Sequence, residues 1–98
     1  MKYTLFISDE AKIEIAKAYQ WYEENNEMGD RFMGAFSEQC ALIENNPYQF
    51  PIKHKLFRSA LLRYFPFHMI YEIMGSKITL YAFYQVNRHP QTYRSNSN

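Results

Sequence analysis

The stretch FHMIYEIMGSKITLYAFYQV, residues 67–86, decides the fold of this 98-residue chain. Its side chains follow a period of two on both sides of Gly75 and Ser76, and a two-residue Gly-Ser loop between such runs predicts a tight β-hairpin. If Met74 faces Lys77 across the turn, the pairs along one face are Ile73 with Ile78, Tyr71 with Leu80, Met69 with Ala82 and Phe67 with Tyr84. This face is almost wholly apolar, so other elements must cover it.

The opposite face of the hairpin is mixed and is predicted to stay open. It carries His68, Ile70, Glu72, Thr79, Tyr81, Phe83 and Gln85. Aromatic side chains on an open sheet can stack on a ligand. They are also good strand formers, and the sequence leaves both interpretations open.

The first half of the chain is predicted to form the helices that cover this apolar face. Residues 3–7 alternate as a short strand, which Ser8 and Asp9 end as helix caps. Apolar residues then recur at helical spacing in two runs, first Ala11, Ile15, Ala18 and Tyr22, and after a turn at residues 25–29 Phe32, Phe36, Cys40 and Ile43. The second run stops at Asn46 and Pro47. We therefore expect an antiparallel helical hairpin, with Trp21 and Tyr22 packed in its core.

Residues 47–55 contain two prolines and are predicted to be irregular, and residues 58–63 form one more strand. The predicted fold class is α+β, a two-helix antiparallel hairpin packed on a small antiparallel β-sheet in the order β-α-α-β-β-β. The length allows one domain, residues 1–94, followed by a polar C-terminal tail, residues 95–98.

Charge divides the chain at Pro51. The first 50 residues hold four Lys or Arg and nine acidic residues, for a formal charge of −5, and the last 48 hold seven and one, for +6. A basic half suggests an anionic partner. The alternative is ion pairing between the halves, for example Arg58 with Glu44.

Several classes of protein are excluded or disfavoured. Cys40 is the one cysteine, so neither a disulfide framework nor a cysteine-based zinc site is expected. The three His are widely spaced and no Gly-rich phosphate loop occurs, so no metal and no cofactor is implied. No secretory signal and no apolar run of membrane-spanning length is seen, so we expect a cytoplasmic protein with no membrane partner.

A series of short landmarks resembles the RelE/ParE superfamily of toxins from bacterial toxin-antitoxin modules, and is closest to its ParE-like, plasmid-stabilisation branch. The landmarks, in order, are Trp21-Tyr22-Glu23, Gly29, Arg31-Phe32, Asn46-Pro47, Phe50-Pro51, Arg58, residues 63–67, Ile70-Tyr71, Arg88-His89-Pro90 and Tyr93-Arg94. They span residues 5–94. The fold of this family agrees with the one predicted from the patterns.

The resemblance implies a growth-inhibiting toxin that a cognate antitoxin neutralises by wrapping around it. RelE-like members are metal-independent endonucleases of ribosome-bound messenger RNA (mRNA interferases), whereas ParE-like members act on DNA gyrase. In the nuclease pattern His68 stands where a catalytic Arg is found, Arg88 matches a second Arg and Tyr93 lies near a functional Tyr. The presence of His68 in place of the catalytic Arg, and a modest isoelectric point of about 7.8, favour a toxin that acts by binding.

The residues predicted to bind the target or the antitoxin are Lys53, Lys55, Arg58, Arg63, Tyr81, Phe83, Gln85 and Arg94. Three functions follow from these observations. The first is a toxin that inhibits DNA gyrase by binding, the second is a ribosome-dependent mRNA endonuclease, and the third is a degenerate toxin that acts in its antitoxin complex and in autoregulation.

Overall fold

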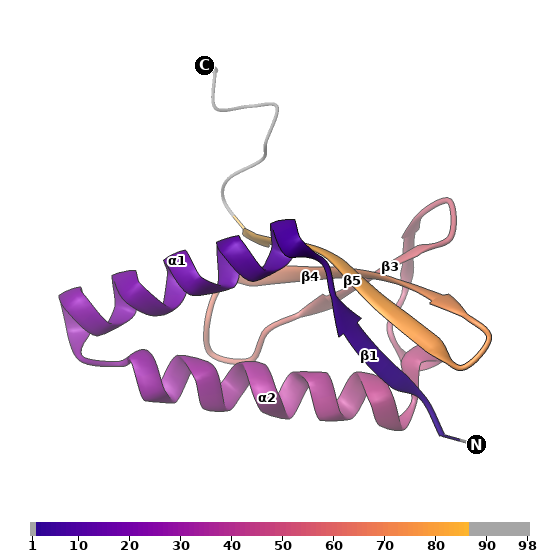
Figure 1. The fold of residues 1–98 in the computed structure, drawn as a ribbon, viewed down its shortest axis with the longest axis horizontal. Helices are drawn as coiled ribbons and strands as arrows, with labels where there is room; N and C mark the ends of the chain where they lie inside the picture. Colours follow the sequence, from indigo (N-terminus) through magenta and orange to yellow (C-terminus); the bar gives the residue numbers. More distant parts are fainter. Residues whose placement is uncertain (1, 87–98) are drawn as a thin grey trace, which may run out of the picture.

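The computed structural model describes residues 2–86, and two helices cover one side of a five-stranded sheet (Figure 1). The elements are β1 Thr4–Ile7, α1 Asp9–Asn26, α2 Gly29–Asn45, a short 3-10 helix Pro47–Gln49, β2 Ile52–His54, β3 Phe57–Leu61, β4 Phe67–Met74 and β5 Lys77–Gln85. The predicted α+β class, with a helical hairpin packed on a sheet, is confirmed.

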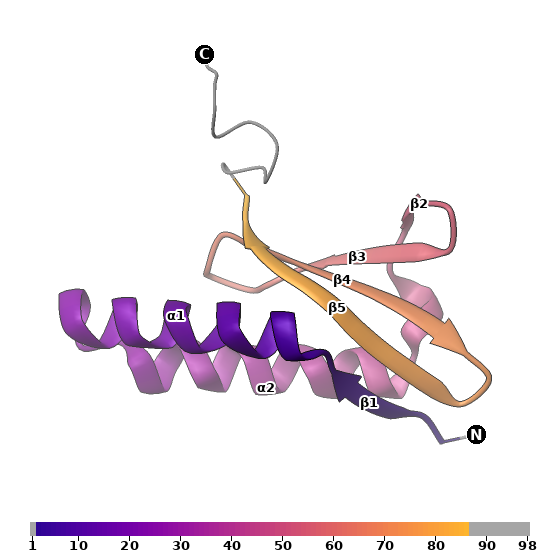
Figure 2. The ribbon, with the colours of Figure 1, turned by 45° about the horizontal axis from the view of Figure 1, so that its top comes forward.

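The sheet has the strand order β1-β5-β4-β3-β2, and it differs from the prediction in two respects. Residues 52–54 form an additional edge strand, β2, within the segment predicted to be irregular. In addition, β1 runs parallel to β5, pairing Thr4 with Lys77, so the sheet is mixed whereas an antiparallel one was predicted. Figure 2 shows β1 continuing into α1 beside β5.

Ser8 joins the sheet to the helical layer. Its hydroxyl accepts a hydrogen bond from Ala11 N at 3.1 Å, which caps α1, and donates one to Tyr81 O at 3.1 Å. Its backbone N–H donates to Leu80 O at 2.9 Å. One serine therefore satisfies an amide at the helix start and two carbonyls at the edge of β5.

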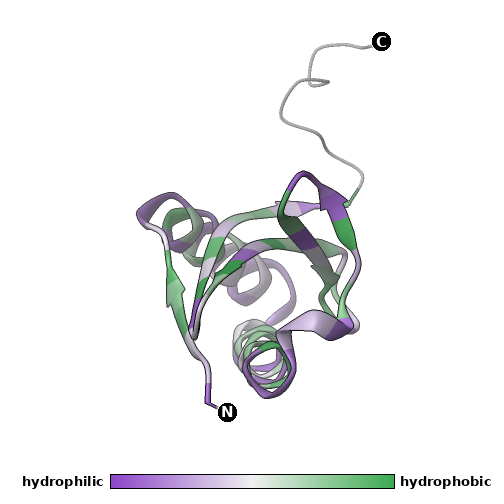
Figure 3. Cartoon of the chain, turned by 90° about the vertical axis from the view of Figure 1, so that its right-hand side faces the viewer, coloured by the Kyte–Doolittle hydropathy of each residue, from purple (hydrophilic) through white to green (hydrophobic). Residues whose placement is uncertain are grey.

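The helices bury the predicted apolar faces against the sheet, which curves over α2 in Figure 3. Ala11, Ile15 and Ala18 of α1 and Phe32, Phe36 and Ile43 of α2 are all buried. A Cβ at Gly29, in the hairpin turn, would lie 2.5 Å from Glu23 Oε1 and 2.7 Å from Tyr19 Cε1, so these side chains would have to move to accommodate it. Gly29 N instead donates to Glu23 Oε1 at 3.1 Å.

Aromatic rings fill the centre of the core. Phe32 is fully buried, and its ring centroid lies between 5.4 and 5.8 Å from those of Tyr22, Phe65, Phe67 and Phe83. Pairs in these stacked and edge-to-face arrangements contribute about 0.5–1.5 kcal/mol beyond their buried area. The predicted core position of Tyr22 is confirmed. That of Trp21 is wrong: its side chain is 57% exposed, because it lies on the side of α1 that turns away from α2.

A β-bulge at Tyr81 changes the predicted hairpin register. The pairs from Met74–Lys77 to Tyr71–Leu80 are as predicted, but Ile70 then pairs with Ala82, and Met69 with Phe83. The extra residue inverts the alternation over the rest of β5. Phe83, which was predicted on the open face, is therefore buried at 1% exposure, and Gln85 also leaves that face, while Tyr84 joins it.

Candidate functional site

The side of the sheet turned away from the helices is the candidate functional surface. We call it the open face and define it as Phe57, Ser59, Leu61, His68, Ile70, Glu72, Thr79, Tyr81 and Tyr84. Its residues alternate along each strand with buried ones such as Ala60 and Met69. The Phe57 and Tyr81 rings meet edge to face, with centroids 5.6 Å apart. His68 and Tyr81 lie on this face as predicted.

His68 lies at the centre of the open face. Its Nδ1 is 3.3 Å from Ser59 Oγ on β3, and its ring centroid is 5.2 Å from that of Tyr84 on β5. These two contacts fix the orientation of the imidazole ring. Ser59, Phe57 and Tyr84 were not predicted as site residues. Ser59 and Phe57 could have been found from the period of two along residues 57–61. Tyr84 could not, because the bulge shifts it to the open face.

Cationic residues flank the open face on the side of β2. Lys53 lies on β2 and lines a hollow of about 530 Å³ together with Ser59, His68 and the adjoining Phe50–Ile52 and Leu61. Lys55 follows β2 in the turn to β3, where its φ of 54° is in the left-handed region. Arg63 lies in the loop after β3, with its guanidinium 5.2 Å from the centroid of the Tyr64 ring. Lys53 is therefore a predicted cation that shares a hollow with His68.

Arg58 lies on the covered side of the sheet and holds the segment between α2 and β2. Its Nη1 donates to Phe50 O at 2.7 Å and to Tyr48 O at 3.3 Å, and its guanidinium carbon is 5.1 Å from the centroid of the Tyr48 ring. Tyr71 supports the same segment, because its hydroxyl donates to Pro47 O at 2.6 Å. Burial raises the pKa of Tyr71 to about 12, against a smaller lowering by Arg58.

Ion pairing between the two halves does not explain the charge division. Within residues 2–86 one ion pair is present, between Lys17 and Glu14 of the same helix, at 3.9 Å. Glu44, the expected partner of Arg58, instead accepts a hydrogen bond from Leu5 N on β1 at 3.0 Å. The cations that flank the open face are therefore available to another molecule.

Cys40 is not a reactive thiol. It is partly buried on α2, and burial, together with the charge of Glu44, raises its pKa to about 12. Because the thiolate is the reactive form, Cys40 is inert near neutral pH.

Three of the predicted site residues cannot be placed in the structure. Arg88, Tyr93 and Arg94, and the predicted tail 95–98, lie outside the described residues. Among residues 2–86, no three His, Cys, Asp or Glu side chains are grouped so that they could hold a metal ion. Within the same range, neither helix is long and apolar enough to cross a membrane.

Comparison with known proteins gives a fold but not a sequence family. No family model matches the chain, and no curated protein matches it. The structure is similar to a chain in the solved "Chromosomal ParDE TA system from P. aeruginosa", with a TM-score of 0.76 and 18% sequence identity. The match covers 88% of this chain and 98% of that chain. At this identity the likeness establishes a shared fold, the one that the landmark residues implied.

Proposed function

We propose that this protein is the toxin of a bacterial toxin-antitoxin module, which a cognate antitoxin neutralises. The observation that carries the proposal is the fold, shared over 88% of the chain with a component of a ParDE toxin-antitoxin system. The ordered landmark residues of the ParE-like branch support it independently, because they come from the sequence and not from the coordinates. The cations beside the open face, which form no ion pair within residues 2–86, provide an anionic partner with a binding surface.

We further propose that the toxin acts by binding, with DNA gyrase as its target. Messenger RNA cleavage requires cations and a proton donor to converge on one phosphate. In the described part of the chain two of the predicted cations are engaged elsewhere. Arg58 lies on the covered side against Phe50 O, and Arg63 lies over Tyr64 in a loop. The open face has an aromatic and aliphatic centre with charge at its border, which suits a protein partner.

A second candidate function, the mRNA endonuclease, has one observation in its favour. Lys53, Ser59 and His68 line the same hollow on the open face. An oriented imidazole next to an ammonium group is a suitable pair for moving a proton near a phosphate. This candidate needs Arg88 or Tyr93 to complete the site.

Controlled expression in a bacterial host tests the toxin assignment. We expect growth to stop on induction and to resume when the product of the neighbouring reading frame is co-expressed. Tyr81→Ala removes a ring from the open face and should abolish the arrest, whereas Leu42→Ala, a change at an exposed side chain of α2, should not. Unimpaired growth with soluble wild-type protein would contradict the proposal and favour the degenerate toxin.

A further inference from the structure

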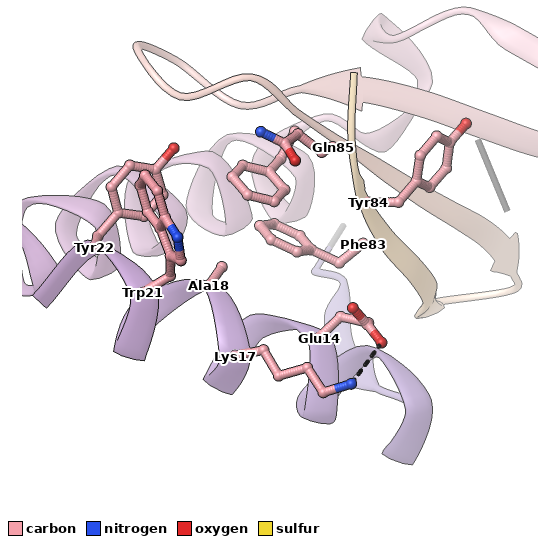
Figure 4. Close-up of a pocket in the computed structure, with 9 residues that line it drawn as sticks. Glu14, Lys17, Ala18, Trp21, Tyr22, Phe83, Tyr84 and Gln85 are labelled. Atoms are coloured by element: carbon pink, nitrogen blue, oxygen red, sulfur yellow. Dashed lines mark ion pairs between the residues drawn. The ribbon is translucent and has the colours of Figure 1, made fainter. Parts of the chain in front are cut away.

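A groove runs between α1 and the second half of β5 (Figure 4). It consists of two adjoining hollows of about 350 and 320 Å³, which share Glu14, Phe83 and Tyr84. We call it the α1–β5 groove. It shares Tyr81 and Tyr84 with the open face, but the two surfaces lie on different sides of β5: the side chain of Gln85 is directed toward α1 in Figure 4, while that of Tyr84 is directed away from it.

The backbone of β5 offers hydrogen bonds to this groove. β1 pairs with β5 only as far as Leu80. On the other side of β5, Val86 N donates to Pro66 O at 2.7 Å, which continues the ladder with β4. Because peptide groups alternate between the two sides of a strand, those of Phe83 and Gln85 are directed away from β4. Within residues 2–86 these groups have no hydrogen-bond partner on that side.

Peptide groups arranged in this way are a template for an added strand. An extended segment beside Phe83 and Gln85 would satisfy them and enlarge the sheet by one strand, a recurring mode of peptide recognition. A helix laid in the groove would leave the same peptide groups unsatisfied. The backbone geometry therefore favours an extended occupant.

The side chains of the groove define the apolar part of the occupant. Trp21 of α1 is 57% exposed, and Tyr22, Phe67 and Phe83 form an aromatic floor beside it. Exposed Trp residues are strongly enriched among the residues that dominate binding energies. An apolar side chain is expected to occupy this end of the groove.

The other end of the groove is acidic. Glu10 and Glu14 line it, and the one cation of the groove within the described residues, Lys17, is held to Glu14 only by a 3.9 Å pair whose side chains are 71% and 52% exposed. Such a pair contributes little and is easily exchanged. A Lys or Arg of the occupant would complement this end.

We propose that the α1–β5 groove binds an extended segment of a partner chain as an additional strand beside β5. The segment carries one apolar side chain against Trp21 and one basic side chain near Glu10 and Glu14. Glu14 and Trp21 are seven helical residues, or about 10 Å, apart, which a strand spans in about three residues. Because side chains on one face of a strand are two apart, the apolar and basic residues should be separated by two or four positions. The identification of this partner as the antitoxin rests on the proposed function.

The test uses the full ¹⁵N-labelled chain and a synthetic peptide, acetyl-Thr-Lys-Thr-Trp-Thr-Lys-Thr-amide. Its Trp and both Lys lie on one face of an extended strand. We expect chemical-shift changes at the Phe83 and Gln85 amides and at the Trp21 indole N–H. At saturation, hydrogen exchange of the Phe83 and Gln85 amides should slow at least tenfold. The dissociation constant should rise at least tenfold in Trp21→Ala and about fivefold in Glu14→Lys, and it should not change in Tyr64→Ala.

A peptide with Glu in place of both Lys serves as the charge control. It should bind the wild type about fivefold more weakly and regain affinity for Glu14→Lys. Equal binding of both peptides, unchanged affinity in Trp21→Ala, or no binding at millimolar peptide would overturn the proposal. So would slow exchange of the Phe83 and Gln85 amides before peptide is added, because residues 87–98 of this chain would then be the occupant. None of these results bears on growth arrest, so the toxin assignment is tested separately.

Discussion

The covered and open faces of the sheet are made by the same strands but are stabilised differently. On the covered face, Tyr71, Met69 and Phe83 are buried and meet the aromatic core of the helical hairpin. On the open face, His68, Tyr81 and Tyr84 contact mainly one another and their strand neighbours. The difference teaches that stability resides in the first face, so the second can change its chemistry at little cost to folding.

The largest effect on this comparison is expected from Phe83→Ala. This substitution removes a buried ring that stacks on Phe67, with centroids 4.7 Å apart, and contacts Phe32 and Phe36. The free energy of unfolding should fall by about 3–5 kcal/mol, measured by urea denaturation. Phe83→Leu should lose much less. A loss below about 1 kcal/mol for Phe83→Ala would indicate that Phe83 lies on the open face, and it would contradict the bulge at Tyr81.

Tyr71→Phe should cost about 1–3 kcal/mol near neutral pH, because Pro47 O loses its buried donor. The loss should depend on pH. The pKa of Tyr71 is about 12 in the folded protein and near 10 when exposed, so the folded state retains the proton that the unfolded state loses. Stability is therefore retained below pH 10 and falls between pH 10 and 12. Denaturation across this range should show a smaller fall in Tyr71→Phe, and equal slopes in both proteins would contradict the assignment.

Gln39→Leu is expected to stabilise the covered side of the molecule, whereas the two changes above destabilise it. Gln39 of α2 is only 5% exposed, and within the described residues its side-chain amide has no hydrogen-bond partner. Replacing a buried unpaired amide with an apolar group of similar size should stabilise the fold by about 1 kcal/mol. Thermal unfolding would detect the gain, and Glu38→Leu on the exposed side of the same helix is the matched control. A loss of stability in Gln39→Leu would show that the amide has a partner.

The smallest effect on stability is expected on the open face. Tyr81→Ala removes an edge-to-face contact with Phe57 and should lower the free energy of unfolding by less than about 1 kcal/mol. Its thermal midpoint should remain near that of the wild type even though growth arrest is abolished. A destabilisation as large as that of Phe83→Ala would mean that the two faces are not separable.

The helical hairpin, the Gly-Ser turn and most of the core could be predicted, because periods of 3.6 and 2 report directly which side chains are buried. The bulge could not. Residues 81–84 are apolar or aromatic at every position, so either register buries an apolar side chain. The parallel pairing of β1 depends on a contact between residues about 70 apart, and the exposure of Trp21 depends on where α2 crosses α1. Phe83 and Gln85 were misplaced, and the α1–β5 groove was missed, for these reasons.

The most direct test of the central claim, that this toxin acts by binding through the open face, is a DNA gyrase supercoiling assay with purified protein. The wild type should inhibit supercoiling, and Tyr81→Ala should require at least tenfold more protein for the same inhibition. In a translation extract followed by primer extension, the wild type should leave messenger RNA intact. Unaffected gyrase, together with cleavage between codon bases that disappears in Arg88→Ala, would contradict the account and establish the endonuclease instead.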